Sequence, residues 1–184
     1  MILQTERLIL REVKESDIDD LVKEMNNIKI SSCLLEVPHP FKMNHAKIWI
    51  KHCLKTAKKK TRTDYIFAIT FKEEDKMIGE VILSDVDLYQ KKAELAFWLS
   101  ESHWKKGIVS EAVECVIDFA FNSLKVNRLE MSIFAKNEAS NALAKKLGFK
   151  YEGTKREASM PESTGELHDD HFYSLLRKEY LKNE

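Results

Sequence analysis

The sequence has little glycine and little proline, with five and three of these residues in a chain of 184. It also lacks internal repeats and long linkers. Hydrophobic residues make up 43% of the chain and charged residues 33%, a balance that allows a buried core under a polar surface. We therefore expect residues 1–184 to form a single domain.

Cysteine is scarce as well, and the chain has no formal net charge. Cys33, Cys53 and Cys115 are far apart and lack metal-ligand spacing, and an odd number without a framework is typical of a reducing compartment. The 30 basic residues are balanced by 30 acidic ones. Because non-specific nucleic-acid binding needs a basic excess, this balance argues against direct nucleic-acid binding.

Long apolar runs are missing too. The first residues, MILQTERLILREV, are too charged for a signal peptide, and no apolar segment approaches membrane-spanning length. These features predict a cytoplasmic globular protein that does not bind membranes.

What is present is a clear hydrophobic periodicity. Alternating or apolar runs predict strands at residues 8–13, 65–71, 77–86, 93–99, 128–135, 149–153 and 170–176. Helical spacing predicts a helix from its N-cap Ser16, one from Ala46 to Ala57, one after Gly107, and a short one from about Ala139 to Leu147. The order βααβββαβαββ indicates a mixed α/β (α+β) sandwich on one sheet of about seven strands, not a doubly wound repeat.

The stretch HWKKGIVSEAV, residues 103–113, joins a predicted strand to a predicted helix. A helix N-terminus presents free N–H groups and a partial positive charge, so such a turn can bind an anion. Gly107 allows close approach to the backbone, Ser110 can donate a hydrogen bond, and Lys105 and Lys106 add charge. Taken alone, the stretch is more typical of an ordinary turn, because short glycine motifs recur by chance.

Further segments, in a fixed order, carry a family resemblance. They are TERLILRE, VPHPF with the helix that contains Trp49 and Ile50, AELAFWL, HWKKGIVSEA, NEASNALAKKLGF and HDDHFYSLLRKEY. Together they resemble the GNAT superfamily of N-acetyltransferases, and more closely the RimJ/RimL branch that acetylates the N-termini of ribosomal proteins. The resemblance covers nearly the whole chain and implies the GNAT fold, a mostly antiparallel sheet whose central pair of strands splays apart.

The resemblance implies acetyl-CoA as the cofactor. Backbone amides in the turn would hold its pyrophosphate, which implicates Lys106, Gly107, Ile108, Val109 and Ser110, with Lys105 beside them. The pantetheine arm would lie between the splayed strands, against Trp98 and Leu99, and would reach Asn137, Ser140 and Asn141. Val109 is bulkier than the family pattern, and Asn137 also suits a helix N-cap. We expect no metal, because strand alternation separates the side chains of residues 168–171.

Acetyl transfer needs a neutral amine, so a general base is useful. The resemblance implicates Glu94 as this base, and a surface carboxylate is the alternative explanation for it. Glu80 is the second candidate, although an edge or cross-strand charge explains it more simply. Ser140 is the implied hydrogen-bond donor to the leaving thiolate, although a helix-start serine explains it equally well. Ala144 stands where many members of the superfamily have a tyrosine.

The sequence says least about the amine that would accept the acetyl group. The loops SSCLLEVPHPF and GTKREASMPESTGELHD would border its groove, and Glu36, Glu157, Glu162 and Glu166 could attract a cationic amine. A protein N-terminal α-amine is the first candidate. A polyamine or another small amine stays open, as does a degenerate acetyl-CoA-binding sensor without turnover. A homodimer is also left open, since dimers occur in this branch.

Overall fold

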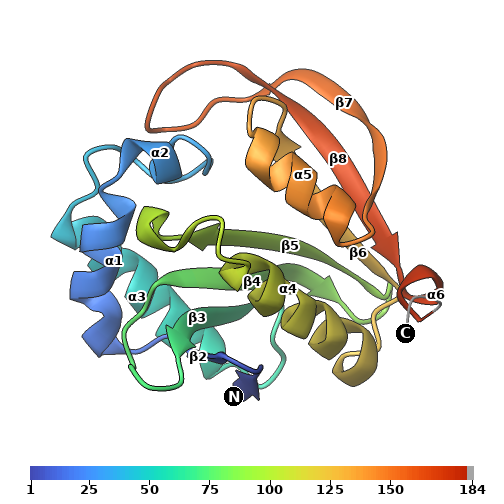
Figure 1. Ribbon diagram of the computed structural model, residues 1–184, viewed down its shortest axis with the longest axis horizontal. Helices are drawn as coiled ribbons and strands as arrows, with labels where there is room; N and C mark the ends of the chain where they lie inside the picture. Colours follow the sequence, from blue (N-terminus) through green and yellow to red (C-terminus); the bar gives the residue numbers. More distant parts are fainter. Residues whose placement is uncertain (182–184) are drawn as a thin grey trace.

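The structure, a computed structural model, describes residues 1–181 and is built on one eight-stranded sheet (Figure 1). The strands are β1 (Ile2–Gln4), β2 (Leu8–Glu12), β3 (Tyr65–Phe71), β4 (Gly79–Asp87), β5 (Lys92–Leu99), β6 (Arg128–Phe134), β7 (Lys150–Ser159) and β8 (His168–Leu176). The helices are α1 (Ile18–Met25), α2 (Ile28–Ser31), α3 (Met43–Ala57), α4 (Ile108–Asp118), α5 (Glu138–Lys146) and α6 (Arg177–Tyr180).

The strand order is β1-β2-β3-β4-β5-β6-β8-β7, and all neighbours are antiparallel except β5 and β6. These two parallel strands pair only from Lys92 opposite Arg128 to Glu94 opposite Glu130. Beyond these pairs they diverge, which opens the V-shaped gap seen in Figure 1. The predicted mostly antiparallel sheet with a splayed central pair is therefore confirmed. It has one strand more than the sequence indicated, because the short β1 pairs with β2.

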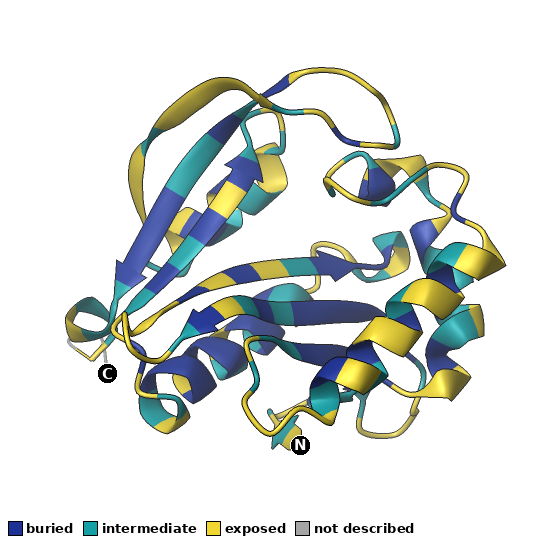
Figure 2. Cartoon of the chain, turned by 180° about the vertical axis from the view of Figure 1, so that it is seen from behind, coloured by how far each residue is buried: buried dark blue, intermediate teal, exposed yellow. Residues whose placement is uncertain are grey.

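Two hydrophobic clusters cover the two faces of the sheet. One packs α4 residues such as Val113, Val116 and Ile117 against the strands, and the other packs Leu21 of α1 and Ile50 of α3. Figure 2 shows the buried residues on the central strands and inner helix faces, whereas the edge strand β7 is largely exposed. The alternation along β5 thus places Ala93, Leu95 and Leu99 in the cluster with α4 and Trp98 in the cluster with α3.

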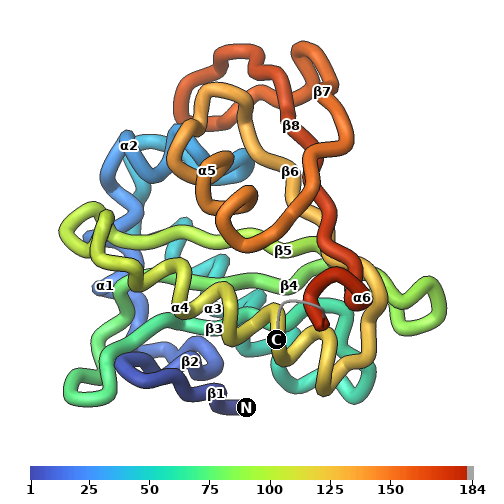
Figure 3. Tube along the Cα trace, turned by 45° about the vertical axis from the view of Figure 1, so that its right-hand side comes forward, coloured from blue at the N-terminus to red at the C-terminus, as the bar shows by residue number. Residues whose placement is uncertain are grey.

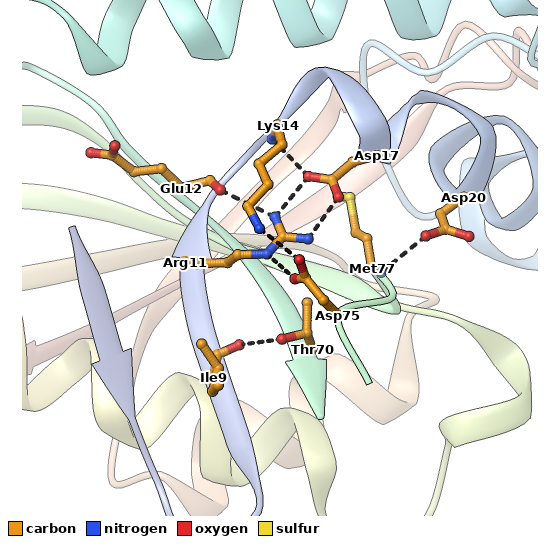
Figure 4. Close-up of polar contacts among 9 residues, drawn as sticks. All are labelled: Ile9, Arg11, Glu12, Lys14, Asp17, Asp20, Thr70, Asp75 and Met77. Atoms are coloured by element: carbon orange, nitrogen blue, oxygen red, sulfur yellow. Dashed lines mark hydrogen bonds and ion pairs between the residues drawn. The ribbon is translucent and has the colours of Figure 1, made fainter. Parts of the chain in front are cut away.

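A buried ion pair fixes the entry to α1 (Figure 4). The guanidinium of Arg11 donates to both oxygens of Asp17 at 2.8 and 2.7 Å, and it also contacts Asp75 in the β3–β4 turn. Asp17 further accepts from the backbone N–H of Lys14 at 2.7 Å. The N-cap predicted at Ser16 is therefore wrong: a 3₁₀ turn, Glu15–Asp17, precedes the helix, and the Asp17 carboxylate holds it.

The loop between β7 and β8 crosses the open end of the V. It meets the loop after α2, where the N–H of Glu162 donates to the carbonyl of Leu35 at 3.0 Å (Figure 3). The two loops expected to border the acceptor groove thus touch each other. Among residues 1–181, none of the helices combines the length and the hydrophobicity that a membrane crossing requires.

Candidate active site

The splay between β5 and β6 contains a cavity of about 570 Å³. Residues 95–99 of β5 and 131–134 of β6 form its two walls. The start of α4 and one face of α5 close one end, and α2 with its following loop closes another. The lining includes these residues predicted from the sequence: Trp98, Leu99, Lys105, Gly107, Val109, Ser110, Asn137 and Ser140.

The turn before α4 has a left-handed residue directly at the start of the helix. Gly107 is the N-cap residue with φ of 74°, in the left-handed region that favours glycine. Ile108 is buried in the core, and Lys106 lies outside the cavity lining with its carbonyl accepting from Arg7 at 3.2 Å. Any contribution of these two residues to a ligand would therefore come from their backbone N–H groups.

Arg7 supports this turn from the other side. Its Nε donates to Glu111 in the first turn of α4 at 2.6 Å, and its backbone N–H donates to the same carboxylate at 2.9 Å. Thr5 donates to Glu111 as well, at 2.5 Å. The β1–β2 turn and the N-terminus of α4 are thereby held together.

Lys146 is a residue of the cavity that the sequence analysis did not identify. Its Nζ donates to Ser110 Oγ at 3.3 Å, so a cation from the last turn of α5 lies beside the first turn of α4. A signal was available, because Ser140, Leu143 and Lys146 follow at spacings of three and share one helix face. With Lys105, it surrounds the helix N-terminus with positive charge, which favours an anionic ligand.

The two predicted asparagines have different surroundings. Asn137 lines the cavity and also caps α5, since its Oδ1 accepts from the N–H of Ser140 at 3.1 Å. Asn141 is buried outside the lining. Its amide donates to the carbonyls of Phe134 and Asn137, and its Oδ1 accepts from Tyr173 at 2.8 Å and lies 3.0 Å from His171 Nδ1.

Asn141 thus ties β6, α5 and β8 together, and its side chain has few hydrogen-bonding positions left for a ligand. Ser140 is half-buried and lines the cavity one helical position earlier. The geometry keeps Ser140 as a candidate donor and gives Asn141 a structural role.

The two candidate bases lie in contrasting environments. Glu94 is exposed at the paired end of β5, outside the large cavity and in a second one with Glu130 and Asp85. Although the residue as a whole is exposed, partial desolvation of the Glu94 carboxylate raises its pKa, and the negative charges of Asp85 and Glu130 raise it further. Glu80 is 1% exposed, and burial raises its pKa to about 7 even though two indole groups donate to it. Neither carboxylate lines the large cavity.

The end of β5 is closely packed at the cavity wall. The indole of Trp104 donates to the carbonyl of Leu99 at 2.8 Å. A Cβ atom added to Gly79 would lie 2.5 Å from the carbonyl oxygen of Trp98, so only glycine lets β4 approach this closely. The backbone of Trp98 and Leu99 is thus fixed from two sides.

Asp169, Asp170 and His171 of β8 have hydrogen-bond partners within the protein, whereas both ring nitrogens of the buried His168 have none in the part of the chain that the structure describes. Asp169 accepts from the N–H of Glu157 at 2.8 Å, and Asp170 accepts from Ser159 at 2.5 Å. Among residues 1–181, no group of three or more candidate ligands is placed to hold a metal ion.

This arrangement of a splayed sheet, a glycine turn and a cavity defines an acyltransferase fold. The chain belongs to the GNAT acetyltransferase family, because the family model described as an acetyltransferase (GNAT) domain matches residues 7–150. It is 32% identical over 180 residues, covering 97% of each chain, to the uncharacterized N-acetyltransferase p20 of Bacillus licheniformis.

Relatives with named substrates also match. The ribosomal-protein-serine acetyltransferase of Escherichia coli is 32% identical over 98 residues, 53% of each chain. The solved structure of RimL, a ribosomal L7/L12 alpha-N-protein acetyltransferase in complex with coenzyme A, has a TM-score of 0.81 at 20% identity and covers 96% of this chain and 98% of that one. The resemblance to the RimJ/RimL branch is thereby supported, and the chain is an N-acetyltransferase.

Proposed function

We propose that this N-acetyltransferase uses acetyl-CoA and transfers the acetyl group directly to a primary amine. A protein N-terminal α-amine is the first candidate acceptor. The observation that carries the proposal is the cavity between β5 and β6, which ends at the positively charged N-terminus of α4. Coenzyme A bound to the RimL neighbour is consistent with this ligand.

The residues present fit the cofactor chemically. The N-terminus of α4 with Lys105 and Lys146 suits a pyrophosphate, and the walls of β5 and β6 suit an extended arm that pairs with strand backbone. Acetyl-CoA would supply an acyl thioester: a carbon–nitrogen bond forms, the carbon–sulfur bond breaks, and the amine loses a proton while the thiolate gains one. Ser140 would donate a hydrogen bond to the leaving sulfur.

Glu94 remains the proposed base, acting through water. It precedes Trp98 by four residues on the same strand face, which corresponds to roughly 13 Å along a strand. That separation is too long for direct contact with an amine beside Trp98. Because Glu94 is exposed and its pKa is raised, it is more basic than an ordinary carboxylate and can accept a proton from a water chain. Glu80 is less suited, because both of its oxygens already accept indole N–H groups.

The alternatives are a polyamine or another small amine as acceptor, and a sensor without turnover. Glu36 and Glu162 lie on the two loops that meet at the open end, and Glu157 lies near the end of β7; these carboxylates would attract either kind of cationic acceptor. Ala144 is fully buried and offers no acid in place of a tyrosine. These alternatives therefore need a direct assay.

The test is thiol release from acetyl-CoA with a panel of N-terminal peptides, spermidine, spermine and free amino acids. We expect the fastest release with a peptide, and acetylation at its α-amine by mass spectrometry. Faster release with a polyamine than with every peptide would identify a small-amine enzyme. Tight acetyl-CoA binding without release across the panel would favour the sensor. Size-exclusion chromatography of the same sample would settle the oligomeric state.

A further inference from the structure

A buried carboxylate lies directly behind the cavity wall formed by β5. Glu80 is opposite Trp98 in the β4–β5 register, on the sheet face that α3 covers. Its Oε2 accepts from the indole of Trp98 at 2.7 Å, and its Oε1 accepts from the indole of Trp49, on α3, at 2.9 Å. One carboxylate thus joins the cavity-lining strand to the helix behind it.

This arrangement gives hydrogen-bond partners to buried polar groups that would otherwise destabilise the fold. Trp98 is 4% exposed and Glu80 is 1% exposed, so an indole N–H without an acceptor here would lose its hydrogen bond to water without compensation. A carboxylate has two acceptor oxygens and can serve two donors, whereas an amide has only one acceptor oxygen. The residue type at position 80 therefore matches the two donors.

The contact reaches the reacting region through Trp98. Its side chain belongs to the cluster with α3, and the residue also lines the cavity next to Leu99. Gly79 adjoins Glu80 and brings β4 against the carbonyl of Trp98. A shift of the Trp98 indole would therefore move the part of β5 that borders the proposed thioester site.

We propose that Glu80 is a positioning residue for acetyl transfer: by accepting the indoles of Trp98 and Trp49, it fixes the cavity-lining end of β5 against α3. The inference rests on the proposed function, because it assigns a role to that same site. Glu80 does not contact the cavity, so it acts through Trp98.

The groups that face Glu80 make this contact sensitive to pH. Asp17 raises the pKa of Glu80, and the α3 residues nearby are the Cys53 thiol and Trp49, which stacks on His52 at 5.5 Å. Opposite it on β3 is the apolar Ala68. Burial is the largest cause of the raised pKa of about 7. The ionised form, which accepts both indoles best, therefore predominates only above neutral pH.

The test compares Glu80→Gln with Glu73→Gln, an exposed carboxylate in the β3–β4 turn. At pH 8 we expect Glu80→Gln to lower kcat about tenfold, as for a lost charge-assisted hydrogen bond, with a much smaller change in KM for acetyl-CoA. Glu73→Gln should match the wild type. Wild-type kcat in Glu80→Gln would overturn the proposal.

Two measurements need no turnover, so they separate this inference from the proposed function. Hydrogen exchange should be faster at residues 96–99 in Glu80→Gln than in the wild type. In a Trp104→Phe background, which leaves Trp49 and Trp98, tryptophan fluorescence should change with a midpoint near pH 7. That transition should vanish in Glu80→Gln.

Unchanged exchange together with a persisting fluorescence transition would overturn the proposal even if the enzyme is active. If Glu80→Gln does not fold, Trp49→Phe keeps the carboxylate and removes one donor from outside the cavity. It should also speed exchange at residues 96–99, and unchanged exchange there would contradict the role of Glu80.

Discussion

Lys146 shows how a single side chain can complete a backbone site. It lines the cavity and donates to Ser110, whereas its likewise exposed neighbour Lys145 lies on α5 outside the lining. We expect Lys146→Met to raise the dissociation constant of acetyl-CoA roughly three- to tenfold, the range for a partly exposed charge on an anion. Calorimetric titration at low and high salt would measure this. Equal effects of Lys146→Met and Lys145→Met would contradict a specific contact.

Glu94 provides a second prediction for a single residue. A base must be ionised to accept a proton, so activity should fall as the pH drops through the raised pKa of Glu94. We expect Glu94→Gln to lower kcat/KM about tenfold to a hundredfold at pH 7, and to move the rise in rate to higher pH, toward the pKa of the free amine.

The matched control for Glu94 is Glu130→Gln, which removes a neighbouring negative charge and leaves the base. Because Glu130 raises the pKa of Glu94, this control should shift the acid limb of the rate profile to lower pH. A Glu94→Gln enzyme with the wild-type pH profile would show that the proton leaves by another route.

Among the structural elements, the start of β4 and the start of α4 both depend on glycine, for different reasons. At Gly79 an added Cβ atom would collide with the carbonyl of Trp98, whereas at Gly107 it would make only an ordinary contact, 3.6 Å from Arg7 Nη2, but φ is 74°. We expect Gly79→Ala to cost about 1–3 kcal/mol through overpacking, and Gly107→Ala about 1–2 kcal/mol through the left-handed conformation.

Asparagine distinguishes these two causes, because it tolerates the left-handed region but is larger than alanine. Gly107→Asn should therefore be more stable than Gly107→Ala, whereas Gly79→Asn should be less stable than Gly79→Ala. Urea unfolding of the four variants measures the order. The same order at both positions would refute one of the two explanations.

The elements that the sequence predicted well are those with a long periodic pattern. The alternation of AELAFWL predicted β5, and the apolar stripe from Ala46 to Ala57 predicted α3. The short elements β1, α2 and α6 were missed, because three or four residues carry too little periodicity. Distant contacts hold α2 in place, since Asn27 and Lys29 both donate to Glu101 in the turn before α4.

The part of the candidate site that is formed by backbone could be predicted from the sequence. The turn at Gly107 follows from a local motif, and its left-handed conformation requires that glycine. Asn141 and Glu80 could not be assigned from their neighbours in sequence, because their partners Tyr173 and Trp49 are 32 and 31 residues away. The splay of β5 from β6 followed from the family resemblance and not from the strand patterns.

At the scale of the whole molecule, charge contacts make stability depend on pH in two opposite directions. Arg128 and then Ser174 lower the pKa of Glu152 to about 2, and the pKa values of Asp75 and Glu111 are also lowered. Groups with lowered pKa stabilise the fold above their unfolded pKa, and this contribution is lost as the pH falls toward about 2. Glu80 has the opposite effect, because its pKa is raised.

Glu80 should therefore make the fold less stable as the pH rises through the mildly acidic range. Between the ordinary glutamate pKa of 4.5 and the raised pKa of about 7, the folded carboxyl keeps a proton that the unfolded chain has lost. The folded state binds more protons there, so the free energy of unfolding falls with rising pH, by on the order of 3 kcal/mol for a shift of this size. Glu80→Gln cannot ionise and should lack this decline. Urea unfolding of the wild type, Glu80→Gln and Glu73→Gln from pH 4 to 8 measures it. A constant difference between the wild type and Glu80→Gln across that range would show that Glu80 does not titrate in the folded protein.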